Sequence, residues 1–256
     1  MSLRRLAGRL RRHDWVAAGI ELAIVVVGIL IALYLSDLNQ ARLDRARADD
    51  NYRRLSAELA SDADAITATR AFWRQVADYG TAAMRHLESG ERVDDSNWKT
   101  VLAYYQASQM MPLELADTTF LEMRESGALS LMDEGLRKGL ADYYRVTGIG
   151  MRANILRHDP VYRVQVRGLT PWLVQRYIWD KCYRQLAGTL QELIDCPSPI
   201  SDVAAARILD GYAKEPSLLA NLRYWVATLR VSQNVVRETQ RTQAALSRDI
   251  EAERQP

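Results

Sequence analysis

Hydrophobic residues form one uninterrupted run near the start of the chain. From Trp15 to Leu35 the sequence reads WVAAGIELAIVVVGILIALYL, and Glu21 is the only residue in it with a charged side chain. A helix needs about 20 apolar residues to cross the hydrocarbon core of a bilayer. Trp15 and Tyr34 lie at the two ends of the run, where aromatic rings favour the lipid headgroups. The pattern predicts a transmembrane helix over residues 15–35.

A cleaved signal peptide is the alternative interpretation of this run. Its apolar region would be about 7–15 residues long and would precede a small-x-small cleavage site. Here the run is longer and is followed by SDLNQ, and the first small-x-small triplet, Ala46-Arg47-Ala48, lies farther along the chain. We therefore favour an uncleaved anchor.

After the span, apolar residues recur every three or four positions, which is the period of a helix face. No Gly or Pro interrupts the chain between Leu30 and Tyr79. The membrane helix is therefore predicted to continue as a helical stalk over residues 36–80. The stripe consists of Leu38, Ala41, Arg45, Ala48, Tyr52, Leu55, Leu59, Asp62, Ile66, Thr69, Trp73 and Val76.

A second long helix is predicted at the C-terminal end, over residues 216–252, with Pro216 in its first turn. Its stripe becomes polar toward the C-terminus, and we expect this helix to pack antiparallel along the stalk. The stripe consists of Leu218, Leu222, Trp225, Leu229, Ser232, Val236, Thr239, Gln243, Leu246 and Ile250.

The remaining pattern completes an all-α prediction, in which residues 81–256 form an antiparallel helical bundle outside the membrane. Residues 161–167 alternate between apolar and polar and fit a short strand as well as an irregular helix. The other helices are expected over residues 97–111, 117–126, 133–144, 171–182 and 201–212.

Charge adds an orientation to this picture. The chain has 34 Lys and Arg against 32 Asp and Glu, and the tail of residues 1–14 carries five of the arginines. The part after residue 35 is close to neutral, which argues against nucleic acid as a partner. Basic residues favour the cytoplasmic side, although five more arginines follow the span between residues 42 and 54. We expect a cytoplasmic N-terminus and a periplasmic body.

Glu21 is the residue of the span that needs an explanation. It lies about 9 Å into the span at 1.5 Å per residue, where an unpaired carboxylate is costly. It could reach back to the headgroups and Arg12, form a hydrogen bond to another helix, or line a pore for protons or cations. Gly28 and Ala32 are a small-xxx-small pair, which allows close helix packing. One helical stripe, the predicted transmembrane interface, comprises Ala17, Glu21, Ile24, Gly28, Ala32 and Leu35.

The two cysteines are the second candidate feature. Cys182 and Cys196 enclose a short stretch that ends just before Pro197. In an oxidising compartment they could form a disulfide, which the chain-entropy model values at about 3 kcal/mol for a loop of this size. The alternative is a pair of unconnected buried thiols.

No motif predicts a catalytic site, a metal site or a cofactor. The three histidines are scattered, and there is no HExxH, GxSxG or Walker sequence. His86 is expected to be solvated near a helix end, and His158-Asp159-Pro160 is expected to form a turn. Gly148-Ile149-Gly150 is expected to break a helix, because the third glycine of a dinucleotide fingerprint is missing. We therefore expect a protein that is not an enzyme.

Two segments resemble an uncharacterised bacterial family of single-pass inner-membrane proteins. They are IELAIVVVGILIALYLSDLNQ, with its Glu-bearing span and GILIAL core, and TTFLEMRESGALSLMDEGLRKGLADYY. That family usually has Trp beside the exit Asn, where this chain has Leu38. The resemblance implies a bacterial inner-membrane location and no specific activity. The matching positions are Glu21, Gly28, Ile29, Ala32, Asn39, Phe120, Ser126, Gly127, Leu131, Leu140, Tyr143 and Tyr144.

Together these features predict a membrane-anchored helical interaction protein, scaffold or accessory subunit. It would associate with itself or with another membrane protein through the face that carries Glu21. The alternative is a homo-oligomeric pore for ions or protons that Glu21 lines.

Overall fold

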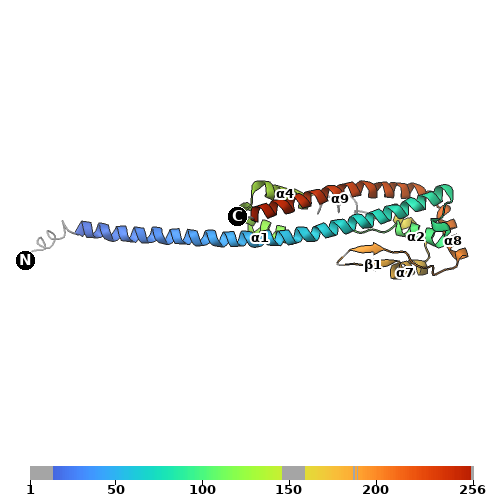
Figure 1. The fold of residues 1–256 in the computed structure, drawn as a ribbon, viewed down its shortest axis with the longest axis horizontal. Helices are drawn as coiled ribbons and strands as arrows, with labels where there is room; N and C mark the ends of the chain where they lie inside the picture. The colour runs from blue at the N-terminus through green and yellow to red at the C-terminus, as the bar shows by residue number, and fades with distance from the viewer. Residues whose placement is uncertain (1–13, 146–158, 187, 189, 255–256) are drawn as a thin grey trace, which may run out of the picture. The chain divides into compact units, whose positions relative to one another are not determined.

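The computed structural model describes residues 14–145, 159–186, 188 and 190–254, and the all-α prediction is confirmed (Figure 1). The chain divides into two units, Met1–Asn51 and Tyr52–Pro256. The helices are α1 (Asp14–Ser89), η1 (Val93–Asp95), α2 (Asn97–Gln106), α3 (Thr118–Ser126), η2 (Ala128–Leu131), α4 (Glu134–Tyr144), α6 (Val161–Leu169), α7 (Trp172–Lys181), α8 (Asp202–Ala213) and α9 (Leu218–Arg254). Strands β1 (Tyr183–Gln185) and β2 (Gln191–Leu193) form a small antiparallel hairpin.

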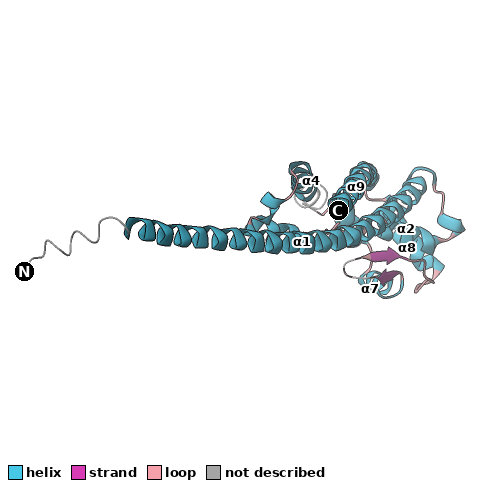
Figure 2. Cartoon of the chain, turned by 60° about the vertical axis from the view of Figure 1, so that its left-hand side comes forward, coloured by secondary structure: helices cyan, strands magenta, loops and turns pink. Residues whose placement is uncertain are grey.

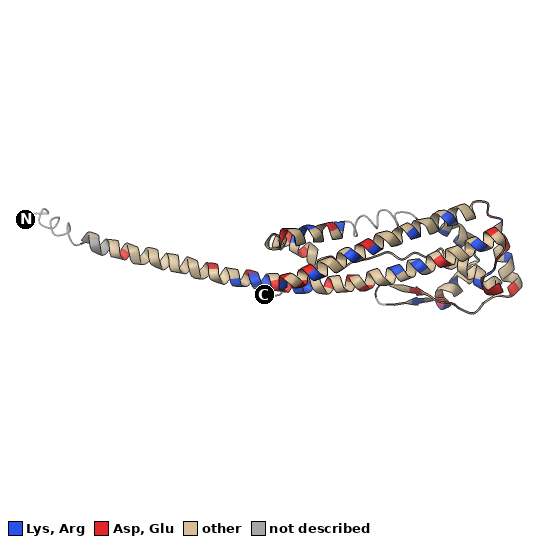
Figure 3. Cartoon of the chain, turned by 45° about the horizontal axis from the view of Figure 1, so that its top comes forward, with Lys and Arg blue, Asp and Glu red and all other residues tan. Residues whose placement is uncertain are grey.

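The first unit contains the N-terminal part of α1. Figure 3 shows a long stretch of this helix without basic residues and with a single acidic position, followed by a densely charged stretch. Its described side chains are exposed or half-buried. Among the described residues, α1 is the one helix that is long and apolar enough to cross a membrane, by length and composition.

In the second unit, α9 packs antiparallel against the later part of α1 (Figure 1). Gln243 Nε2 donates to the carbonyl oxygen of Leu59 at 2.7 Å, and Gln233 Nε2 donates to that of Trp73 at 3.3 Å. The partner on α1 lies later in the chain as the partner on α9 lies earlier, which is the pattern of antiparallel helices. Polar side chains on α9 therefore bond to the backbone of α1 inside the helix pair.

The apolar stripes explain why these two helices pair. From Leu55 to Val76, every stripe position of α1 is buried, whereas Leu38 and Ala41 of the first unit are exposed. Every predicted stripe position of α9 is buried as well. The buried side chains form two apolar clusters, one centred on α2, α6, α7 and α8 and the other on α3 and α4, and both include α1 and α9.

Helix α2 is shorter than predicted, because the chain leaves the helix after Gln106. The indole nitrogen of Trp225 donates to the carbonyl oxygen of Ala107 at 2.8 Å. The indole nitrogen of Trp73 donates to that of Met111 at 2.9 Å. These two bonds satisfy buried carbonyl groups of a non-helical segment, as buried backbone requires. Tertiary contacts thus end this helix about five residues early.

Two further local outcomes differ from the sequence pattern. Residues 161–169 are helical, because Tyr162 and Val166 are buried one turn apart while Val164 is exposed. The hairpin of β1 and β2 is absent from the prediction, and Gly188 adopts a positive φ of 59° between its strands. Strands of three residues with mostly polar side chains give no alternating signal that sequence analysis can detect.

Candidate functional site

The predicted interface of the span lies on one continuous helix, and no described part of the chain covers it. Ile24 and Leu35 are 66 and 59 % exposed, and Glu21 and Ala32 are exposed too. A Cβ atom added to Gly28 would meet no atom within 4 Å. The backbone of Ala17 belongs to α1, but its side chain lies outside the described part of the structure.

Glu21 makes no hydrogen bond or ion pair with any described residue. It is one helical turn from Ile24 and two from Gly28, so its carboxylate shares a face with a position where a neighbouring backbone can approach. The chain itself supplies no shelter for this carboxylate in the described residues.

The structure contains a disulfide between Cys182, at the end of α7, and Cys196, with a Cα–Cα distance of 5.2 Å. Cys182 is fully buried, and its carbonyl oxygen accepts hydrogen bonds from Gln106 Nε2 at 2.8 Å and from the backbone N–H of Ile194 at 3.2 Å. The disulfide and these bonds together fix the end of α7 against α2 and against the segment that follows β2.

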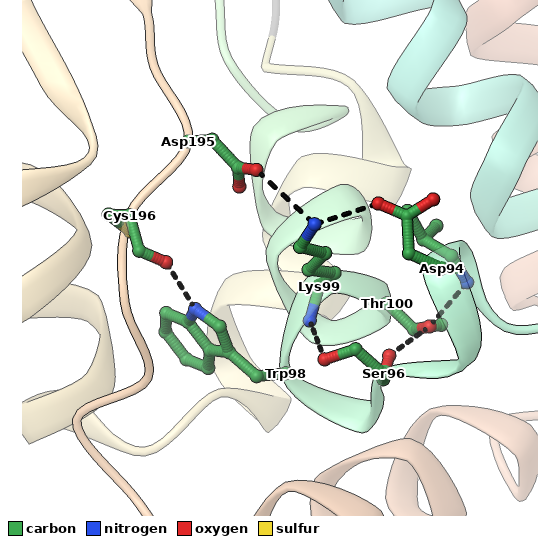
Figure 4. A network of polar contacts seen from close by, with 8 residues as sticks. Asp94, Ser96, Trp98, Lys99, Thr100, Asp195 and Cys196 are labelled. Atoms are coloured by element: carbon green, nitrogen blue, oxygen red, sulfur yellow. Dashed lines mark hydrogen bonds and ion pairs between the residues drawn. The ribbon is translucent and has the colours of Figure 1, made fainter.

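Polar contacts around Cys196 fix the same segment to the first turn of α2 (Figure 4). Trp98 Nε1 donates to the carbonyl oxygen of Cys196 at 2.9 Å. Lys99 Nζ lies 2.7 Å from a carboxylate oxygen of Asp94 and 3.7 Å from one of Asp195. Lys99 thus lies between two aspartates, and these contacts join the segment around Cys196 to the start of α2.

Two arginines of α6 form a cluster that sequence analysis missed. Arg163 donates to the carbonyl oxygen of Ser108 at 2.7 Å, and Arg167 donates to the hydroxyl of Ser108 at 3.2 Å and to the amide oxygen of Gln109 at 2.9 Å. Burial, together with the charge of Arg163, lowers the pKa of Arg167 to about 10. Both guanidinium groups are therefore partly buried and hydrogen-bonded to the segment after α2.

Aromatic rings complete the surroundings of Arg167. Its guanidinium carbon lies 5.0 Å from the ring centre of Tyr105 and 5.6 Å from that of Trp179, distances typical of cation–π contacts. Gln175 Nε2 donates at 2.8 Å to the carbonyl oxygens of both Arg167 and Thr170, which joins α6 to α7. The arginine is thus positioned beside the aromatic face of α7.

A buried carboxyl group lies between α1 and α4. Asp62 is 1 % exposed and accepts hydrogen bonds from the backbone N–H of Ala116 at 2.8 Å and from the hydroxyl of Tyr143 at 2.9 Å. Burial is the main reason that the pKa of Asp62 is raised to about 6, and the nearby carboxylates of Glu58 and Asp117 add to it. This is an acid whose charge changes near neutral pH.

The expectation of a solvated His86 was wrong. This ring is half-buried, and its Nδ1 lies 2.8 Å from the hydroxyl of Tyr104. Burial first, and then the charge of Arg92, lower the pKa of His86 below its usual value. His86 therefore packs against Tyr104 near the end of α1, where burial disfavours its charged form. His13, His158 and the Gly148-Ile149-Gly150 sequence lie outside the described residues.

No group of His, Cys, Asp and Glu side chains among the described residues has an arrangement that could hold a metal ion. Comparison of the chain with family models, with curated proteins and with solved structures finds no match. The resemblance noted in the sequence therefore stays a prediction, and the site has to be interpreted from its own chemistry.

Proposed function

We propose that the protein is a membrane-anchored helical interaction protein, a scaffold or accessory subunit, that associates through the Glu-bearing face of its span. The observation that carries this proposal is an exposed Glu21 without a partner among the described residues, on a helix segment apolar enough to cross a bilayer. Lipid tails alone would leave the carboxylate unsatisfied at a cost of several kcal/mol.

A neighbouring helix would remove that cost. Gly28 and Ala32 allow close backbone approach on the same face, and a polar group of the partner can bond to Glu21. The partner is a second copy of this chain or another membrane protein. Helix association of this kind needs no catalytic residues.

We place the protein in the bacterial inner membrane, with a cytoplasmic N-terminal tail and a periplasmic body. The five arginines of the tail support this orientation. The disulfide of Cys182 and Cys196 supports an oxidising compartment for the body, because disulfides are rare in the cytosol.

The assembly is tested with a matched pair of glycines. Gly28 and Gly19 are nine residues apart, so they lie on opposite faces of the same helix, and neither has an atom within 4 Å of an added Cβ. We expect Gly28→Leu to weaken association about tenfold by removing close approach. Gly19→Leu is the control and should leave association unchanged.

The measurement is the copy number of the full chain, together with any membrane partner, in native-membrane nanodiscs by single-molecule photobleaching and native mass spectrometry. Equal copy numbers and partner content for both variants would contradict the proposed face. A wild-type chain that is monomeric and without a partner protein would overturn the proposal itself.

The alternative function is a homo-oligomeric pore lined by Glu21, which the exposed carboxylate favours and which needs several copies of a single span. Glu21→Gln keeps the hydrogen-bonding capacity and removes the charge. In liposomes that contain the full chain, a change in proton or cation flux with unchanged assembly would favour the pore. Unchanged flux with weakened assembly would favour the interaction role.

A further inference from the structure

The exposed side of α7 carries large apolar and basic side chains together. Trp172 and Leu173 are 69 and 66 % exposed, Trp179 is 36 % exposed, and Arg176 is exposed between them. Trp172, Arg176 and Trp179 are spaced by four and three residues, so they lie on one face of the helix. We name Trp172, Leu173, Arg176 and Trp179 the α7 surface.

Helix α7 is fixed to its surroundings at three points, Gln175, Tyr177 and Cys182. Gln175 bonds to the backbone at the end of α6, and Tyr177 donates from its hydroxyl to the carbonyl oxygen of Pro197 at 3.0 Å. The disulfide fixes the last turn at Cys182. Figure 2 shows α7 beside the small hairpin, and Tyr183 of β1 meets Trp179 edge to face at 5.1 Å. An aromatic side chain that is held as Trp179 is loses little conformational freedom on binding.

Charge around the α7 surface is unbalanced toward the positive. Among the described residues, Arg167, Arg176 and Lys181 form no ion pair, while Asp180 is the acidic neighbour on the same helix. Arg163 is paired with Asp159 at 3.3 Å. Arg176 and Lys181 are exposed, so their charges are open to a carboxylate from outside, and a guanidinium binds a carboxylate through strong charged hydrogen bonds.

The part of the chain that the structure leaves undescribed cannot provide this carboxylate from a side chain. Residues 146–158 contain Arg152 and Arg157 but no Asp or Glu, and residues 1–13, 187, 189, 255 and 256 contain none either. Apart from Asp180, its neighbour on α7, we expect the acidic side chain that complements the α7 surface to come from another molecule.

We propose that the α7 surface docks a protein segment that presents Asp or Glu flanked by apolar side chains. Tryptophan and arginine are the residues that dominate the binding energy of protein interfaces. The guanidinium of Arg176 can bind a carboxylate through two parallel hydrogen bonds, and Trp172, Leu173 and Trp179 can cover the flanking apolar groups. Nucleic acid is disfavoured by the near-neutral charge of the body. This inference adds a second contact to the proposed interaction function.

The test uses the full chain in nanodiscs of zwitterionic lipid and a phage-displayed library of random 12-residue peptides, with empty nanodiscs removed by prior subtraction. We expect the selected peptides to be enriched in Asp or Glu next to Leu, Phe or Trp. Their affinity should fall on replacement of the acid by its amide and on raising the salt concentration, since the charged contact is partly solvated.

Matched variants then locate the peptide. Arg176→Glu and Trp172→Ala should each weaken binding about tenfold. The controls are Arg230→Glu and Tyr224→Ala, which change an exposed arginine and an aromatic residue that is 77 % exposed on α9. Circular dichroism should show unchanged thermal unfolding for all four, because each altered side chain is exposed.

Several outcomes would overturn the inference. They are the absence of enriched peptides, peptides without acidic residues, and equal binding by Arg176→Glu and Arg230→Glu. Displacement of the peptides by vesicles of phosphatidylglycerol but not of phosphatidylcholine would assign the surface to anionic lipid instead of protein. The Gly28→Leu variant separates the two proposals, since it should lose association through the span and keep peptide binding.

Discussion

At the scale of single residues, Asp62 shows how a buried acid can be tolerated in a helical bundle. Two donors, the N–H of Ala116 and the hydroxyl of Tyr143, satisfy its oxygens. Those bonds lower its pKa, but burial has the larger effect and raises the pKa to about 6. The folded protein therefore binds the proton more tightly than the unfolded chain does.

This difference predicts a dependence of stability on pH. Because the folded pKa of Asp62 is raised, its stabilising contribution is fully present below pH 4 and is lost as the pH rises through about 6. The loss is on the order of 3 kcal/mol. Asp62→Asn should remove this dependence, because the amide cannot ionise and can still accept from Ala116.

The measurement is thermal unfolding of the full chain in mild detergent at pH 4, 5, 6 and 8, followed by circular dichroism at the helix band. Asp64→Asn is the control, since Asp64 is exposed two residues away. Parallel curves for wild type and Asp62→Asn across this range would show that Asp62 is not the titrating group.

At the scale of elements, the contact between α1 and α9 depends on a glycine. A Cβ atom at Gly80 would lie 2.5 Å from a methyl carbon of Val226 and 3.5 Å from one of Leu222. Valine is β-branched and has few alternative rotamers, so the methyl group has little room to move. The two helices approach closely at this point because residue 80 has no side chain.

Gly80→Ala is therefore expected to destabilise the fold by about 1–2 kcal/mol, because overpacking outweighs the gain in helix propensity. Gly211→Ala is the matched control in α8, where no atom lies within 4 Å of the added Cβ. It should stabilise by about 0.5–1 kcal/mol. Chemical denaturation of the three full-length chains measures both changes, and a stabilising Gly80→Ala would contradict the close approach.

The elements that sequence analysis predicted well are those with long helical periodicity. In α9 the stripe from Leu218 to Ile250 is buried at every predicted position, including the polar Gln243. Thirty-seven residues of regular spacing give a signal that local contacts cannot override. The end of α2 was not predictable in this way, because it depends on indole groups that come from Trp73 and Trp225.

The candidate sites also differ in whether local sequence or tertiary contacts reveal them. Glu21 stands out in the sequence because its neighbours are all apolar, and local context is enough to notice it. Arg167 looks like an ordinary surface arginine in the sequence. Its partners Tyr105, Gln109 and Trp179 come from three separate segments, so only the tertiary structure reveals its surroundings.

At the scale of the whole molecule, the proposed orientation assigns the tail and the body to opposite sides of the membrane. Tyr224→Cys places a thiol at an exposed position of α9, and Ser2→Cys places one in the tail. Because both natural cysteines are in the disulfide, each variant has one free thiol.

In bacterial spheroplasts, a membrane-impermeant maleimide should label the Tyr224→Cys chain from outside. The Ser2→Cys chain should react only after lysis, because basic tails stay in the cytoplasm. Gel-shift counting of labelled chains measures both. The reverse result would invert the topology, and labelling of both from outside would exclude a membrane-spanning anchor.

The pairing of α1 with α9 also has a consequence for biosynthesis. Gln243 and Leu59, which are hydrogen-bonded in the fold, are 184 residues apart in the chain, and Trp225 and Ala107 are 118 apart. A ribosome makes the apolar stripe of α1 long before it makes the helix that covers it. At about 5–20 residues per second, that stripe stays uncovered for on the order of ten seconds or more, during which the nascent chain is prone to aggregation.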